Sequence, residues 1–204
     1  MLEKVISQDT SRCLETLKTT GFIKDFYLAG GTGLAIQILH RLSLDLDFFS
    51  KKEINTKSLI LQLKELGEFN LEKEDWQTIH GNLKNTKVSF FYYPYPLLYS
   101  LKRVKGVWVA DARDIACMKI DAISRRGAKR DFVDLYFICK QYKLAYLLKL
   151  YEKKYKSIKV NMIHILKSLY YFEDAQKSPM PQMIKDCSWS AVVDFFQEEV
   201  KKLL

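Results

Sequence analysis

Residues 26–50 read FYLAGGTGLAIQILHRLSLDLDFFS and combine a glycine pair, a basic pair and two aspartates separated by one leucine. An apolar, β-prone run stops at Gly30 and Gly31, and the apolar residues that follow recur at the spacing of a short helix. Residues 42–50 alternate, so their leucines and Phe48 share one face of a strand while Asp45 and Asp47 project together from the other. The sequence therefore predicts a glycine turn and a pair of carboxylates within one short segment.

The flanking segments predict further strands and helices around this stretch. The first twenty residues are expected to form a helix that ends at Gly21, and residues 22–31 a strand that enters the glycine turn. Residues 55–67 predict a helix capped by Asn55 or Thr56. Residues 69–96 predict two strands around an Asn/Gly turn, and residues 106–110 a further strand before Asp111, which is expected to cap a helix.

The chain from Asp111 onward is predicted to be almost entirely helical. Helices are expected over 113–126, 129–141, 144–155, 158–175 and 190–203, with residues 176–183 as the linker inside this half. The sequence thus predicts an α+β protein with a mixed-sheet N-terminal lobe over residues 1–110. A helical C-terminal lobe over residues 111–204 is expected to complete the site.

The composition is that of a folded protein with a basic surface. The chain has 204 residues, 48% of them hydrophobic, and a net charge of +9. This charge attracts polyanions such as RNA or nucleotide phosphates, although many basic proteins bind no nucleic acid, and it indicates no DNA specificity. The N-terminus lacks the apolar run of a signal peptide, and no stretch has the roughly 20 apolar residues of a membrane span, so we expect a cytoplasmic protein without a membrane partner.

The glycine turn and the paired aspartates have a simple joint chemistry. Glycines allow a phosphate to approach the backbone, and the N-terminus of the following helix offers N–H groups to an anion. Two carboxylates on one face repel each other unless a cation lies between them, and Mg²⁺ commonly binds one or two carboxylates together with substrate phosphates. Alone, the glycine pair is usually a turn and the aspartates an exposed strand face. Their order along the chain favours a metal-bound triphosphate.

Residues 29–50 resemble the signature of the AbiEii/AbiGii toxin family of nucleotidyltransferases, within the DNA polymerase β-like nucleotidyltransferase superfamily. The matching positions are Gly30, Gly31, Thr32, Asp45 and Asp47. Residues 117–138, CMKIDAISRRGAKRDFVDLYFI, are similar to the family's downstream elements. There the matching residues are Lys119, Arg125 or Arg126, and the run Lys129, Arg130 and Asp131, with Asp134 following.

The resemblance implies a nucleotidyltransferase fold and an Mg²⁺-dependent transfer of a nucleoside monophosphate from an NTP to an acceptor hydroxyl, with release of pyrophosphate. Asp45 and Asp47 would hold the metal, Lys119 would bind phosphate, and Asp131 would position or activate the attacking group. The implied nucleotide-binding residues are Gly30, Gly31, Thr32, Arg41, Ser43 and Arg126. The implied acceptor is RNA, tRNA in particular, and the implied setting is a bacterial toxin–antitoxin or phage-defence pair with a cognate antitoxin.

One departure from the superfamily pattern keeps a second hypothesis open. Most active members add a third carboxylate on a neighbouring strand, where this sequence offers Ser89. The alternative is a catalytically inactive module of the same fold that binds nucleotide, RNA or a partner protein. His80 and His164 have no partners at ligand spacing and are expected to be structural, and Asp134 is expected to pair with a neighbouring arginine.

Overall fold

The structure, a computed structural model, describes residues 4–204; residues 1–3, which fall in the predicted first helix and in the predicted lobe 1–110, lie outside the described residues. The strands are β1 (Tyr27–Leu28), β2 (Leu46–Ser50), β3 (Phe69–Asp75), β4 (Thr78–Leu83), β5 (Thr86–Tyr92), β6 (Lys102–Val104) and β7 (Val107–Val109). In the described part of the chain they form one mixed sheet of seven strands, in the order β3-β4-β5-β2-β1-β7-β6. β2 lies in its middle, antiparallel to β1 and parallel to β5.

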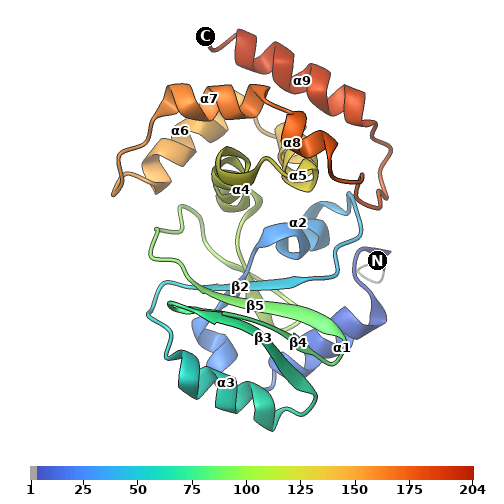
Figure 1. Ribbon diagram of the computed structural model, residues 1–204, viewed down its shortest axis with the longest axis vertical. Helices are drawn as coiled ribbons and strands as arrows, with labels where there is room; N and C mark the ends of the chain where they lie inside the picture. Colours follow the sequence, from blue (N-terminus) through green and yellow to red (C-terminus); the bar gives the residue numbers. More distant parts are fainter. Residues whose placement is uncertain (1–3) are drawn as a thin grey trace.

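The helices cover both faces of this sheet. They are α1 (Gln8–Leu17), the 3-10 helix η2 (Phe22–Asp25), α2 (Gly30–Ile38), α3 (Thr56–Glu65), α4 (Ala112–Arg126), α5 (Lys129–Cys139), α6 (Leu144–Lys154), α7 (Met162–Tyr170), α8 (Glu173–Gln176) and α9 (Trp189–Lys201). α1 and α3 lie on one face, whereas α2 and the helices from α4 onward lie on the other (Figure 1). The predicted α+β class, with a helical C-terminal region, is confirmed.

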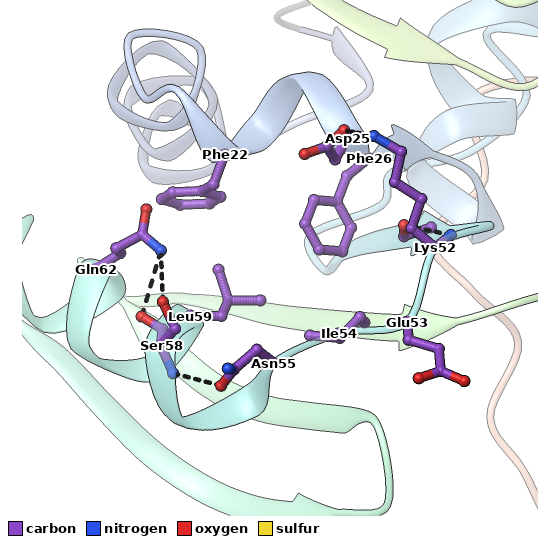
Figure 2. Close-up of a pocket in the computed structure, with 11 residues that line it drawn as sticks. Phe22, Asp25, Phe26, Lys52, Glu53, Ile54, Asn55, Ser58, Leu59 and Gln62 are labelled. Atoms are coloured by element: carbon purple, nitrogen blue, oxygen red, sulfur yellow. Dashed lines mark hydrogen bonds and ion pairs between the residues drawn. The ribbon is translucent and has the colours of Figure 1, made fainter.

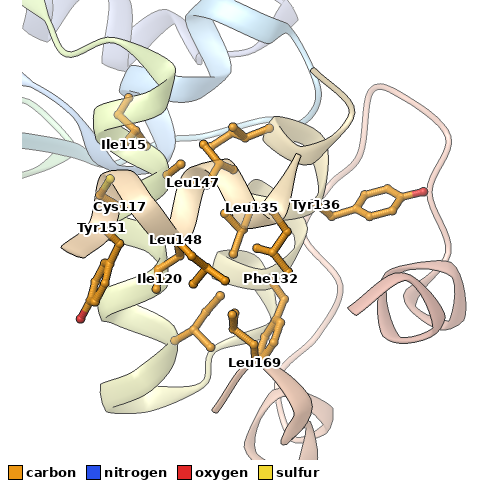
Figure 3. Packing of buried hydrophobic residues seen from close by; sticks show 14 of the residues in the cluster. Ile115, Cys117, Ile120, Phe132, Leu135, Tyr136, Leu147, Leu148, Tyr151 and Leu169 are labelled. Atoms are coloured by element: carbon orange, nitrogen blue, oxygen red, sulfur yellow. The ribbon is translucent and has the colours of Figure 1, made fainter. Parts of the chain in front are cut away.

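Two hydrophobic cores result from the alternation of residues along the strands. Leu46, Phe48 and Phe90 point toward α1 and α3 and are fully buried there. The second core gathers around α4, and Figure 3 shows Ile120 of α4 and Leu148 of α6 among the side chains that pack together. Burial of such apolar side chains stabilises a fold by about 1.5–3 kcal/mol each. The sheet is therefore covered by helices on both faces.

The segment over residues 69–96 differs most from the sequence-based expectation. The prediction of two strands there is wrong, since β3, β4 and β5 form three, each antiparallel to the next. The two tight turns between these strands use residues other than glycine at positive φ: Gln77 at 50°, Lys84 at 49° and Asn85 at 62°. The strand β6 was also not predicted.

Smaller differences concern the ends of elements. Residues 22–25 form η2 rather than a strand, because Phe26 donates to the carbonyl of Ile23 and both side chains are buried on the same side of the turn. β2 begins at Leu46, so Asp45 lies immediately before the strand, and Leu44 is 49% exposed instead of buried. The helix expected over 158–175 is divided into α7 and α8. The helix caps at Asn55 and Asp111 are confirmed.

A buried ion pair ties α4 and α6 to the loop that follows β5. The Lys154 ammonium lies 2.8 Å from an Asp114 carboxylate oxygen and donates to the carbonyl of Pro96 at 2.7 Å. Asp114 also accepts the backbone N–H groups of Leu98 and Tyr99, each at 3.0 Å. Both charged side chains are fully buried. Removing one partner would leave the other charge buried and uncompensated, which is strongly destabilising.

We therefore expect Asp114→Ala to lower the free energy of unfolding by about 3–5 kcal/mol. Lys177→Ala is the control, because its ammonium is exposed and its ion pair with Asp174 lies at the surface, where such pairs contribute little to stability. Urea denaturation of the three proteins measures the difference. Equal midpoints for the two variants would contradict the structural role of the buried pair.

Candidate active site

A cleft of about 1140 Å³ lies between the sheet and the helices α4 and α5. Its lining contains all but one of the residues that the sequence predicts for the site; these are Gly30, Gly31, Arg41, Ser43, Asp45, Asp47, Lys119, Arg126 and Asp131. Thr32 is the exception, being buried behind the turn. Residues nearly a hundred positions apart in the sequence thus share one cavity.

Thr32 holds the segment that carries the aspartates. Its hydroxyl donates to the backbone carbonyl of Asp45 and lies 2.9 Å from the hydroxyl of Ser43. Because the Thr32 side chain is buried, it fixes the loop against α2 rather than contacting the cleft. Of the glycine-turn residues, the cleft is therefore lined by Gly30 and Gly31 alone.

Gly30 and Gly31 allow the side chains of Asp47, Arg41 and Ser43 to approach the backbone closely, because a side chain at either glycine would collide with them. Gly30 begins α2 with a φ of 60°, and a Cβ built on it would lie 2.5 Å from a carboxylate oxygen of Asp47. A Cβ on Gly31 would lie 2.2 Å from a guanidinium nitrogen of Arg41 and 2.9 Å from the Ser43 hydroxyl. The N-terminus of a helix, with its unpaired N–H groups, is consequently placed directly beside a carboxylate.

Asp47 and Asp45 form the acidic part of the cleft. Burial raises the pKa of Asp47, Lys119 opposes this shift, and the nearby Asp45 adds to it. Asp45 lies 3.8 Å from the Arg130 guanidinium at the cleft edge. Burial and a neighbouring carboxylate make the charge on Asp47 costly, and a divalent cation between the two carboxylates would offset that cost. In residues 4–204 no three His, Cys, Asp or Glu side chains cluster as metal ligands, so the protein would supply two carboxylates to such an ion.

Lys119 and Arg126 form a basic wall opposite the aspartates. Lys119 lies 2.8 Å from one oxygen of Asp131 and 2.6 Å from Asp134, while Arg126 lies 3.0 Å from the other oxygen of Asp131. Burial alone would raise the pKa of Asp131, but the two cations hold it below its ordinary value. Asp131 is therefore a stable anion, and both of its oxygens are in ion pairs. This arrangement favours a role in which Asp131 positions Lys119 and Arg126 over one in which it accepts a proton.

Asp134 connects α5 to the loop before β2. Arg41 donates to its two oxygens at 2.6 and 2.9 Å, and His40 lies 2.7 Å from one of them. Burial lowers the pKa of His40 despite the neighbouring carboxylate, so the imidazole is neutral. Desolvation would raise the pKa of Asp134, yet Lys119 and Arg41 hold it well below its ordinary value. The arginine expected near Asp134 is thus Arg41, which lies far from it in sequence.

The linker after α8 also reaches this loop, which the sequence did not indicate. Leu42 donates its backbone N–H to the carbonyl of Gln182 at 2.8 Å, and the carbonyl of His40 accepts from Ile184 and Lys185 at 2.9 and 3.1 Å. Residues 178–182 line the cleft. The C-terminal part of the chain therefore forms one edge of the candidate site.

Ser89 occupies the position beside Asp47 on the neighbouring strand. Ser89 on β5 and Asp47 on β2 are register partners, so Ser89 lies where the superfamily pattern has its third carboxylate. The Ser89 hydroxyl lies 3.1 Å from Nδ1 of His80 on β4, and both side chains line the cleft. Sequence reasoning missed His80 because this proximity depends on strand register alone.

A smaller pocket of about 160 Å³ lies between η2 and α3, on the other face of the sheet. Figure 2 shows the contacts among its polar groups: Asn55 caps Ser58, Gln62 contacts Ser58, and Lys52 pairs with Asp25. The other lining residues that are labelled are Phe22, Phe26, Glu53, Ile54 and Leu59. Its small volume and the mutual contacts of most of its polar groups leave this pocket without a cluster of groups for chemistry.

A glycine turn at a helix N-terminus, one aspartate on the adjacent strand and a second immediately before it, and a basic wall across the cleft are the parts of a nucleotidyl transferase site. The family model described as "Nucleotidyl transferase AbiEii toxin, Type IV TA system" matches residues 12–105. An uncharacterized protein of Aquifex aeolicus (strain VF5) is 38% identical over 205 residues, covering 98% of this chain and 98% of that protein. The chain belongs to the AbiEii family of nucleotidyl transferase toxins of type IV toxin–antitoxin systems.

A solved structure shares the fold. JHP933 from Helicobacter pylori superposes with a TM-score of 0.51 at 21% identity, covering 95% of this chain and 90% of that one. The likeness extends over the sheet and the C-terminal helices together. The family and the fold predicted from the sequence are confirmed.

Gly30→Ala is expected to lower the free energy of unfolding by about 1–3 kcal/mol, because the new Cβ meets the Asp47 carboxylate at a positive φ. Gly21→Ala is the matched control, since Gly21 has a φ of −67° and no atom within 4 Å of an added Cβ. It should leave stability unchanged or raise it slightly. Urea denaturation compares the two, and equal effects would contradict the close approach of Gly30 and Asp47.

Asp134→Asn is expected to destabilise the protein by about 3–5 kcal/mol near pH 7. The folded-state pKa of Asp134 is lowered, so its stabilising effect is present above the ordinary carboxyl pKa of about 3.9 and is lost as the pH falls toward the folded-state value. The difference in the free energy of unfolding between wild type and Asp134→Asn should therefore become smaller below about pH 4. Urea midpoints of the two proteins, measured from pH 7 to below pH 4, test this prediction. Asp25→Asn, at an exposed aspartate, is the control. A stability difference that does not change with pH would contradict the lowered pKa of Asp134.

Proposed function

We propose that this toxin transfers a nucleoside monophosphate from an NTP to a hydroxyl of RNA, tRNA in particular, and releases pyrophosphate. The observation that carries the proposal is the contact of Gly30 with Asp47, which joins a phosphate-binding helix N-terminus to a carboxylate. A triphosphate on the turn would lie within reach of both aspartates. The roles of the individual residues follow from this placement.

Asp45 and Asp47 are proposed to hold Mg²⁺, with phosphate and water oxygens as the remaining ligands. When bound, such an ion neutralises charge on the phosphates and orients them. Two carboxylates, one of which burial makes costly to ionise, fit a hard cation of this kind. Gly30 and Gly31 leave the backbone open to the phosphates, and Thr32 and Ser43 hold the loop that bears the aspartates.

The basic wall is proposed to bind the phosphates and the leaving pyrophosphate. Three cations, Arg41, Lys119 and Arg126, lie against two carboxylates, so a net positive charge faces the cleft. Lys119 and Arg126 are already ordered by Asp131, which means that they need little reorganisation when charge develops on the phosphates. Arg41 is engaged by Asp134, so it acts on the nucleotide by supporting the turn at Gly31.

RNA as acceptor is supported by the basic surface and by the size of the cleft. A net charge of +9 favours association with a polyanion. A cleft of about 1140 Å³ exceeds the 300–1000 Å³ typical of a small-molecule site, leaving space beside the nucleotide. We further propose a cytoplasmic site of action, a cognate antitoxin as partner and a role in phage defence. No helix among residues 4–204 has the length and apolar character needed to cross a membrane.

The test is transfer of label from each of the four α-³²P NTPs to total RNA and to the protein itself, in the presence of Mg²⁺. Wild type should label RNA, and Asp47→Asn should abolish the labelling because the carboxylate that meets the metal is lost. Asp25→Asn, an exposed aspartate outside the cleft, is the control and should retain activity. The labelled NTP also identifies the base.

Three results would contradict the proposal or a part of it. Label on protein alone would replace RNA by a protein hydroxyl as the acceptor. Absence of label from every acceptor, with Mg²⁺-dependent NTP binding intact, would favour the inactive binding module. Equal labelling by wild type and Asp47→Asn would remove Asp47 from the metal site.

A further inference from the structure

The floor of the cleft carries a row of polar side chains that continues beyond the predicted site. Asp47 on β2 pairs in register with Ser89 on β5, and Ser89 pairs with His80 on β4. Directly opposed residues of adjacent strands point to the same face of a sheet. All three residues line the cleft. The row Asp47, Ser89, His80 therefore crosses three neighbouring strands on the face of the sheet that lines the cleft.

The imidazole of His80 is held in one orientation. Its Nδ1 lies 3.1 Å from the Ser89 hydroxyl. Its ring meets that of Phe91 edge to face, with centroids 5.3 Å apart and planes at 76°. When Nδ1–H donates to the Ser89 oxygen, Nε2 carries the free lone pair. The ring is partly exposed, so a ligand in the cleft can reach it.

The topology fixes the side from which an acceptor would approach. The glycine turn follows β1, which borders β2 on one edge, whereas β5 and β4 extend from its other edge. Attacking and leaving oxygens lie roughly in line in a phosphoryl-type transfer. With the triphosphate on the turn, the acceptor hydroxyl enters over β5 and β4. Two strand spacings place the backbones of Asp47 and His80 about 10 Å apart, which leaves space for the reacting atoms between the side chains.

The carboxylates of the cleft are poorly placed to accept the hydroxyl proton. Asp131 has both oxygens in ion pairs, and Asp121 is paired with Arg125 at 2.8 Å. Asp45 and Asp47 are the proposed metal ligands. Glu72 lies one strand further out, on the irregular part of β3, and is exposed. His80 combines access to the cleft, a fixed orientation and an imidazole nitrogen that can accept a proton.

We infer that His80 is the general base of the transfer and that Ser89 is its positioning residue. The acceptor oxygen forms a bond to the α-phosphorus, and its proton passes to Nε2 of His80. The bond from that phosphorus to the oxygen bridging to the β-phosphate breaks, and pyrophosphate leaves with the electron pair. The inference rests on the proposed function but holds for a hydroxyl of RNA or of protein, and it assigns a catalytic role where a third carboxylate is missing.

The test is the single-turnover rate of label transfer, with enzyme in excess over the labelled NTP. His80→Gln should slow transfer by about 100-fold or more, the typical effect of losing a general base. NTP binding should stay within about threefold of wild type, since the residue lies on the acceptor side. In His80→Ala, added imidazole should restore part of the rate. Glu72→Gln is the matched control from the same cleft and should react at the wild-type rate.

The outcomes separate this inference from the function on which it rests. A wild type that labels no acceptor overturns both. An active wild type with an equally active His80→Gln overturns the role of His80 alone. A slow variant that imidazole does not restore, or whose NTP binding falls as much as its rate, reduces His80 to a structural residue. Loss of activity in Glu72→Gln alone would transfer the role of base to Glu72.

Discussion

Asp134 is the group on which the geometry of the site depends. Its two buried oxygens receive Arg41, His40 and Lys119, which come from the loop before β2 and from α4. Desolvating a carboxylate is costly, and these partners offset the cost. The contacts hold α4 and α5 against the loop before β2, in an arrangement in which the glycine turn, the aspartates and the basic wall face one cavity. The same residue supports both the fold and the chemistry.

The part of the site that is local in sequence could be predicted. Gly30, Asp45 and Asp47 lie within one short segment, and Lys119 and Asp131 are joined by a helix, a capping glycine and the start of another. Propensity, capping and alternation describe such segments well, because each depends on near neighbours. These residues were expected in one site, and the structure places them around one cleft.

The part that depends on tertiary register could not be predicted. Arg41 and Asp134 are 93 residues apart, and nothing in either segment indicates that they meet. His80 was expected to be structural, since its contact with Ser89 depends on the register of β4 against β5, which no local pattern indicates. An Asn/Gly turn was predicted in this segment, and Asn85 at positive φ forms part of the turn between β4 and β5, whereas the turn between β3 and β4, with Gln77 at positive φ, contains no glycine and was not predicted. The strand register and one unpredicted turn thus concealed this row of the cleft.

The backbone hydrogen bonds between residues 182–185 and residues 40–42 affect the order in which the protein can fold during its synthesis. The loop that presents the aspartates receives its last hydrogen bonds from a segment near the C-terminus. During synthesis the N-terminal strands can form well before that segment leaves the ribosome. The candidate site of this toxin is consequently completed only after residues 182–185 have left the ribosome, and a chain truncated before them lacks one of its edges.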